Sequence, residues 1–232
     1  MNFRSYFTEA QCLPDNCDCE FVGPGWIAQP SAFWSSLFYL FFAVLLYTQV
    51  KQKTTTLKLW TLSLILLGLS SHFAHASFIE FAMAMDFSGI ILILSFFYII
   101  RWLNKWITSP WRITFLLLSY QGGLWMTFYS LEKWFKVGLC LIVFFFCIIE
   151  LVHTEGKNFI KARDIHWSLI TLFLSFTFFL TDELKLICDP HSWLQGHSVW
   201  HMGTAVSLYL YGRWRFRTSA STAQENPAAP GP

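Results

Sequence analysis

The chain has 232 residues, of which 55% are hydrophobic and only 13% are charged. A soluble domain carries about a quarter charged residues, so this composition leaves too little polar surface to cover a water-facing core. It indicates an integral membrane protein. The 16 Lys and Arg residues nearly balance the 14 Asp and Glu residues, for a net charge of +2. Such a charge, spread without a basic cluster, offers no surface for nucleic acid, and we expect no nucleic-acid partner.

Seven mostly apolar stretches are long enough to cross a bilayer, which takes about 20 residues of helix. They are residues 31–50, 58–77, 80–100, 112–130, 135–152, 165–182 and 194–213. We therefore predict an all-α integral membrane fold, a seven-transmembrane helix bundle over residues 31–213. An extracytoplasmic segment over 1–30 precedes it, and a tail over 214–232, rich in Ala, Pro, Ser and Thr, is expected to be disordered.

The positive charges alternate between the two sides of this bundle. One side carries 12 of them, namely Lys51, Lys53, Lys58, Arg101, Lys105, Arg112, Lys157, Lys161, Arg163, Arg213, Arg215 and Arg217, and the other carries 4, namely Arg4, Lys133, Lys136 and Lys185. Cytoplasmic loops retain positive charge, so the N-terminus is predicted outside and the C-terminus in the cytoplasm. The membrane would be the inner membrane of a bacterium or an ER- or Golgi-type membrane of a eukaryote.

Histidines near the outer ends of the predicted spans form the main candidate site. His197 and His201 are four residues apart, which places both on one helical face within reach of one cation. A catalytic zinc ion usually has three protein ligands, and His75 lies at a matching depth in the second span. His72 is a rival third ligand on nearly the same face. Spacing alone leaves both open.

Two further polar side chains belong to the same constellation. Asp86 lies near the outer end of the third span with no Lys or Arg close to it in that span, and Ser71 is one helical turn before His75. Ionisable groups inside spans point to function. Three histidines, a carboxylate and a hydroxyl are typical of metal-assisted hydrolysis, in which zinc lowers the pKa of water to near 7. Asp182 and Glu183, at the end of the sixth span, are expected to be interfacial.

The same residues resemble the alkaline ceramidase family, a branch of the seven-span membrane hydrolases that also includes progestin and adiponectin receptor-like proteins. The matching motifs extend over residues 17–205 and are Cys19-Glu20, Gln29-Pro30, Ser71 with His75 and Asp86, Cys188-Asp189-Pro190, and Gln195-Gly196-His197 with Trp200-His201. The Gln-Gly-His-x-x-Trp-His context is similar to the bacterial-type branch.

The resemblance implies one zinc ion per chain bound by His75, His197 and His201, with Ser71 and Asp86 in contact with its water. It implies a ceramide-like lipid substrate, taken from the outer leaflet of the bilayer and cleaved to a sphingoid base and a free fatty acid. It also implies a Cys19–Cys188 disulfide, after which Cys12 and Cys17 could pair locally. Cys140 and Cys147, inside the fifth span, are expected to be inert apolar residues.

Two points stay open at the level of sequence. Animal members of the family carry a calcium-binding motif with an Asn after the Glu, whereas Phe21-Val22-Gly23 follows Glu20 here, so calcium is doubtful as a cofactor. A zinc-dependent lipid esterase on the same scaffold is an alternative function, because water attack on an ester differs little from attack on an amide. A non-catalytic seven-span lipid receptor is the other alternative.

Overall fold

A computed structural model of the chain describes residues 19–23, 25–104, 106–107, 109–131, 133–156 and 162–225. Within these ranges the chain forms seven α-helices and no β-strand, which confirms the predicted all-α fold. The helices are α1 (Pro30–Gln49), α2 (Thr55–Ser77), α3 (Glu80–Asn104), α4 (Pro110–Tyr129), α5 (Lys133–Glu155), α7 (Arg163–Glu183) and α8 (Gly196–Glu225). Each coincides with one of the seven predicted apolar stretches.

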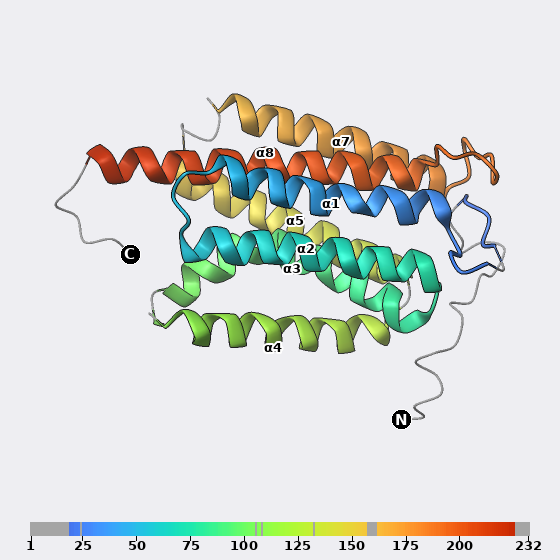
Figure 1. Cartoon of the computed structure of the whole chain (residues 1–232), viewed down its shortest axis with the longest axis horizontal. Coiled ribbons are helices and arrows are strands. Elements are labelled where there is room, and N and C mark those ends of the chain that lie inside the picture. The colour runs from blue at the N-terminus through green and yellow to red at the C-terminus, as the bar shows by residue number, and fades with distance from the viewer. Residues whose placement is uncertain are drawn as a thin grey trace.

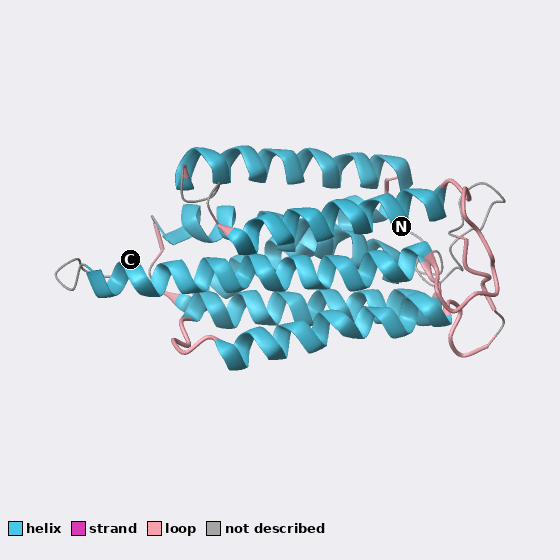
Figure 2. Ribbon diagram, turned by 90° about the horizontal axis from the view of Figure 1, so that it is seen from above, coloured by secondary structure: helices cyan, strands magenta, loops and turns pink. Residues whose placement is uncertain are grey.

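The helices lie side by side along one long axis and form an elongated bundle (Figures 1 and 2). α7 packs on α8, α8 on α1, α1 on α2, α2 on α3, and α3 on both α4 and α5. The segment before α1, the α2–α3 turn and the α7–α8 loop meet at one end of the bundle, and the α1–α2 connection lies at the other (Figure 1). Helices far apart in sequence therefore bring their ends to a common level.

Four helices are long and apolar enough to cross a membrane, namely α1, α2, α3 and α7. In α5 the apolar part is shorter, over Phe135–Ile149. α8 falls outside this group in part because it buries a polar face, which includes Ser198, His201, Thr204 and Ser207. Helices of this length and apolarity indicate a membrane protein, as the composition predicts.

Two helix starts are fixed by side chains. Thr54 precedes α2 and its hydroxyl accepts a hydrogen bond from the Leu57 N–H at 3.2 Å, as an N-cap residue does. Gln29 precedes α1 but makes no capping bond. The carboxylate of Glu20 takes that role instead, accepting the backbone N–H groups of Ser31 and Ala32. This anion at the positive end of the helix dipole stabilises the start of α1.

The apolar core fills the half of the bundle away from the histidines. Leu46, Leu57, Trp60, Leu64 and Phe96 are its largest fully buried side chains. At the other half, α7 and α8 approach closely through Gly203, where a Cβ atom would lie 2.5 Å from the Ser175 Cβ. That close approach holds the histidine-bearing part of α8 against the bundle.

α8 continues past residue 213, the predicted end of the last span. Trp214 and Phe216 are buried, and the Arg213 guanidinium makes a two-pronged contact with Asp164, with a shortest N–O distance of 2.7 Å. The first part of the segment expected to be disordered is therefore helical, because its aromatic side chains pack on neighbouring helices. Residues 226–232 lie outside the described part.

Candidate metal centre

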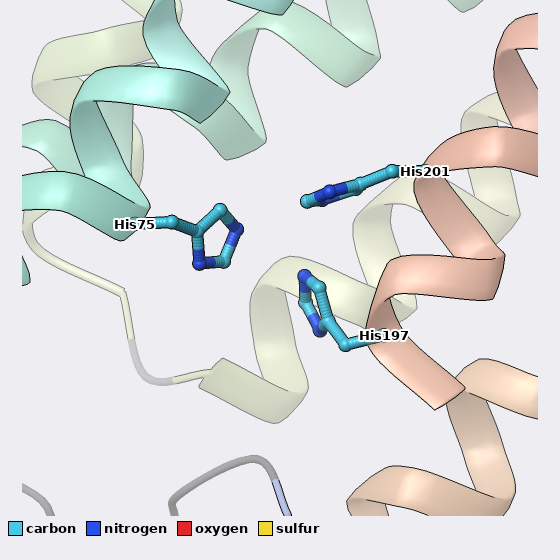
Figure 3. Close-up of side chains that lie close together, drawn as sticks. All are labelled: His75, His197 and His201. Carbon is cyan, nitrogen blue, oxygen red and sulfur yellow. The ribbon is translucent and has the colours of Figure 1, made fainter. Parts of the chain in front are cut away.

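Three imidazoles point toward one another at the end of the bundle where the α7–α8 loop lies (Figure 3). His75 comes from α2, and His197 and His201 come from consecutive turns of α8. Their ring centroids are 4.7 to 5.0 Å apart, and one ligand nitrogen from each lies within 4.8 Å of the others. Among the described residues this is a group that could hold a metal ion.

The orientation of His75 is set by Gln29. The Nδ1 atom of His75 lies 2.7 Å from the Gln29 Oε1, and the backbone N–H of Gln29 donates to the His75 carbonyl at 3.0 Å. An amide oxygen can only accept, so Nδ1 carries the proton and Nε2 presents its lone pair. Gln29 is fully buried. It therefore fixes the tautomer that a metal requires, as outer-shell partners of metal-bound histidines do.

His201 is held in the same tautomer by α1. Its Nδ1 atom lies 3.1 Å from the Ala32 carbonyl oxygen and 3.0 Å from the Ser35 Oγ. The Ser35 hydroxyl donates its own proton to the Ala32 carbonyl, so both neighbours accept from Nδ1. The lone pair of His201 is then on Nε2. Two of the three imidazoles are thus prepared for metal binding by hydrogen bonds on their far sides.

His72 does not join this group. Its ring stacks on Phe33 with a centroid distance of 3.5 Å, and its Nδ1 lies 3.0 Å from the Phe33 carbonyl oxygen and 3.1 Å from the Ser36 Oγ. These contacts direct the side chain toward α1. The geometry therefore favours His75 over His72 as the third ligand.

Ser71 and Asp86 both lie beside the histidines. The Asp86 Oδ2 is 3.9 Å from the His75 Nε2, longer than a hydrogen bond. The Ser71 Oγ is 3.3 Å from the His201 Nε2 and the residue is fully buried. Since that nitrogen holds a lone pair, the Ser71 hydroxyl donates to it. All five predicted site residues are therefore brought together at one point of the bundle.

A cavity of about 980 Å³ opens beside the centre. His75, Asp86 and His197 line it, together with mostly aliphatic and aromatic side chains of α3, α5, α7 and α8 and a few polar ones, among them Lys136 and Thr204. Along α8 the lining runs from His197 to Leu208, a rise of about 16 Å at 1.5 Å per residue. One leaflet of a bilayer is about 15 Å of hydrocarbon. The cavity is therefore about as deep as one acyl chain is long.

The predicted Cys19–Cys188 disulfide is confirmed and joins the N-terminal segment to the α7–α8 loop. Beside it, the Cys19 N–H donates to the Asp182 Oδ2 at 3.0 Å. The prediction that Asp182 and Glu183 are interfacial is wrong, because both are buried. The Asp182 carboxylate thus binds the backbone of the N-terminal segment. Cys12 and Cys17 lie outside the described residues.

Sequence reasoning gave no role to several residues that support the centre. Gln29 and Ser35 position the imidazoles, Glu20 caps α1, and Lys136 is buried and lines the cavity. In the sequence, Gln29 is recognisable only as a Gln before a Pro at a helix start, which is a weak signal for a functional residue. Its burial against another segment of the chain is visible only in the structure. Lys136 looked like a loop charge because it stands near a helix start.

No family model, curated protein or solved structure matches the chain.

Proposed function

We propose that the chain is a zinc-dependent hydrolase of the membrane that cleaves the amide bond of ceramide-like lipids, releasing a sphingoid base and a free fatty acid. The observation that carries this proposal is the meeting of three oriented imidazoles with Asp86 and Ser71 at one end of an acyl-sized apolar cavity. The motifs that resemble alkaline ceramidases include these same five residues.

All seven helices are proposed to cross the bilayer. α4 and α5 carry large apolar side chains on the outside of the bundle, among them Phe115, Leu118, Ile142 and Ile149. Exposed apolar surface of this extent is unfavourable in water and is normal for helices in contact with lipid. With seven spans, the 12 to 4 division of positive charge supports an N-terminus and a metal centre on the outer side.

Zinc is the metal we propose, because three neutral imidazoles with an open fourth position are the donor set of catalytic zinc sites. When bound, it acts as a Lewis acid on the substrate carbonyl and lowers the pKa of water to about 7. Calcium has no part in the proposal. The Glu20 carboxylate, which the family's calcium motif would use, already accepts two backbone N–H groups of α1.

The side chains around the imidazoles supply the proton transfers. Asp86 lines the cavity, and its carboxylate is placed to take a proton from the attacking water. The same carboxyl group then returns that proton to the leaving amine. One water and one amide thus yield one carboxylic acid and one amine. With the His201 Nε2 lone pair engaged by a metal, the Ser71 hydroxyl would be released to donate to the negative charge that develops on the carbonyl oxygen. The apolar walls hold the acyl chain and exclude bulk water.

Metal analysis of the purified full-length protein, combined with a screen for released fatty acid, tests the proposal. We expect one zinc per chain, lost in His75→Ala and retained in His72→Ala, together with hydrolysis of a ceramide that carries a fluorescent acyl chain. An ester analogue is run beside it. Zinc binding without turnover of any lipid would refute the enzyme and favour a receptor, and faster ester cleavage would assign a lipase instead.

A further inference from the structure

A second polar contact lies in the cavity wall, one helical turn deeper than the imidazole of His201. Tyr39 of α1 and Thr204 of α8 both line the cavity, and the Tyr39 hydroxyl is 2.6 Å from the Thr204 Oγ1. Tyr39 follows Ser35 by four residues and Thr204 follows His201 by three, so the pair lies about 5 Å further along the bundle. Tyr39 is 3% exposed and its ring is 5.9 Å from the His201 ring.

The protons of this pair can be assigned from their partners. The Thr204 hydroxyl donates to backbone carbonyls of its own helix, at 2.6 Å to Trp200 and 3.2 Å to His201. A carbonyl can only accept, so the single Thr204 proton is used there. The Tyr39 hydroxyl must then donate its proton to Thr204. The Tyr39 oxygen can therefore only accept a hydrogen bond from a ligand.

We propose that Tyr39 is a specificity-determining residue, whose hydroxyl oxygen accepts a hydrogen bond from an N–H or O–H group of the bound lipid. The Tyr39 ring lies 5.9 Å from the His201 ring, so the hydroxyl reaches groups a few bonds from the carbonyl that is cleaved. An amide N–H and a hydroxyl on the sphingoid chain are the two donors at that distance. An ester lacks the N–H, and a deoxy lipid lacks the hydroxyl. The pair therefore selects for hydrogen-bond-donating lipids.

This inference rests on the proposed function, since it places the scissile carbonyl at the histidines. Its strength is that of one neutral hydrogen bond, a net 0.5–1.5 kcal/mol, or roughly 3- to 10-fold in affinity. The same bond is lost in an analogue without the donor. When an ester oxygen lies beside the Tyr39 oxygen, both are acceptors. The Tyr39 lone pairs then have no hydrogen-bond donor in the cavity.

The test measures equilibrium binding of fluorescent lipids to the full-length protein in nanodiscs, with metal removed by a chelator so that turnover does not interfere. The probes are a lipid amide, its N-methyl amide, its deoxy amide and its ester. Tyr39→Phe should weaken the parent amide by roughly 3- to 10-fold and leave unchanged every analogue that already lacks the responsible donor. The deoxy amide is unaffected if the hydroxyl is bound, and the N-methyl amide and the ester are unaffected if the N–H is bound. Equal loss for all four lipids, or for none, would overturn the proposal.

A reciprocal variant tests the proton assignment. Thr204→Val keeps the shape of the side chain and releases the Tyr39 proton, which can then be donated to an ester oxygen, so ester affinity should rise. No gain would refute the assignment. Tyr209→Phe is the matched control, because the buried Tyr209 hydroxyl donates to the Gln49 Oε1 away from the cavity.

The proposed function fails separately from this inference. Absence of hydrolysis in the metal-loaded protein, with the binding preference intact, refutes only the hydrolase. Intact hydrolysis with an equal effect of Tyr39→Phe on all four lipids refutes only the role of Tyr39.

Discussion

The dependence of metal affinity on Gln29 is the sharpest consequence of the site geometry. Gln29→Leu keeps the size of the side chain and removes the acceptor that lies 2.7 Å from the His75 Nδ1. A buried N–H that loses its acceptor costs about 1–3 kcal/mol. A response that costs less free energy is a switch of the His75 imidazole to its other tautomer, in which Nε2 carries the proton and cannot bind a metal. Both routes weaken zinc binding, and we expect a loss of roughly 10- to 100-fold.

Competition with a chromophoric chelator measures this affinity in the purified protein. Gln29→Glu should restore tight binding, because a carboxylate accepts from Nδ1 at least as well as an amide. Gln49→Leu is the matched control, since Gln49 ends the same helix and contacts Tyr209 instead of a candidate ligand. An unchanged zinc affinity in Gln29→Leu would refute the tautomer argument. Equal losses in both Leu variants would show a general effect on α1.

Three further outcomes are expected. Asp86→Asn and Ser71→Ala should keep zinc and lower kcat roughly 10²- to 10⁴-fold, measured by fatty acid release, and wild-type turnover in Asp86→Asn would refute its role as a base. Gly203→Ala should lower the free energy of unfolding by about 1–3 kcal/mol through overpacking against Ser175, seen as a lower thermal midpoint. Gly123→Ala should not, as a Cβ there meets nothing within 4 Å. A reporter fused to the C-terminus should be cytoplasmic, and an external reporter would contradict the seven-span topology.

The helices and the histidine pair could be predicted from sequence because both are local patterns. An apolar run determines a helix through its own residues, and the spacing of His197 and His201 defines one face without reference to the rest of the chain. Asp86 stood out for a related reason, as a carboxylate in an apolar segment. In each case the signal lies within a single helix.

The choice between His72 and His75 was different, since both lie on nearly the same face of α2. The two are separated only by what α1 presents to them: Phe33 and Ser36 engage His72, whereas Gln29 engages His75. The same limit hid Asp182, whose partner is the distant backbone of Cys19. A polar contact between segments far apart in sequence leaves no periodic trace, so only the tertiary structure reveals it.

The Glu20 cap on α1 has a consequence for biosynthesis. Glu20 is adjacent to Cys19, whose disulfide partner follows 169 residues later in the chain. While the ribosome is still making α7, Cys188, which anchors the segment carrying this cap, is absent, and so are the candidate ligands His197 and His201 of α8. The enzyme we propose would therefore acquire zinc only after the last helix has been made.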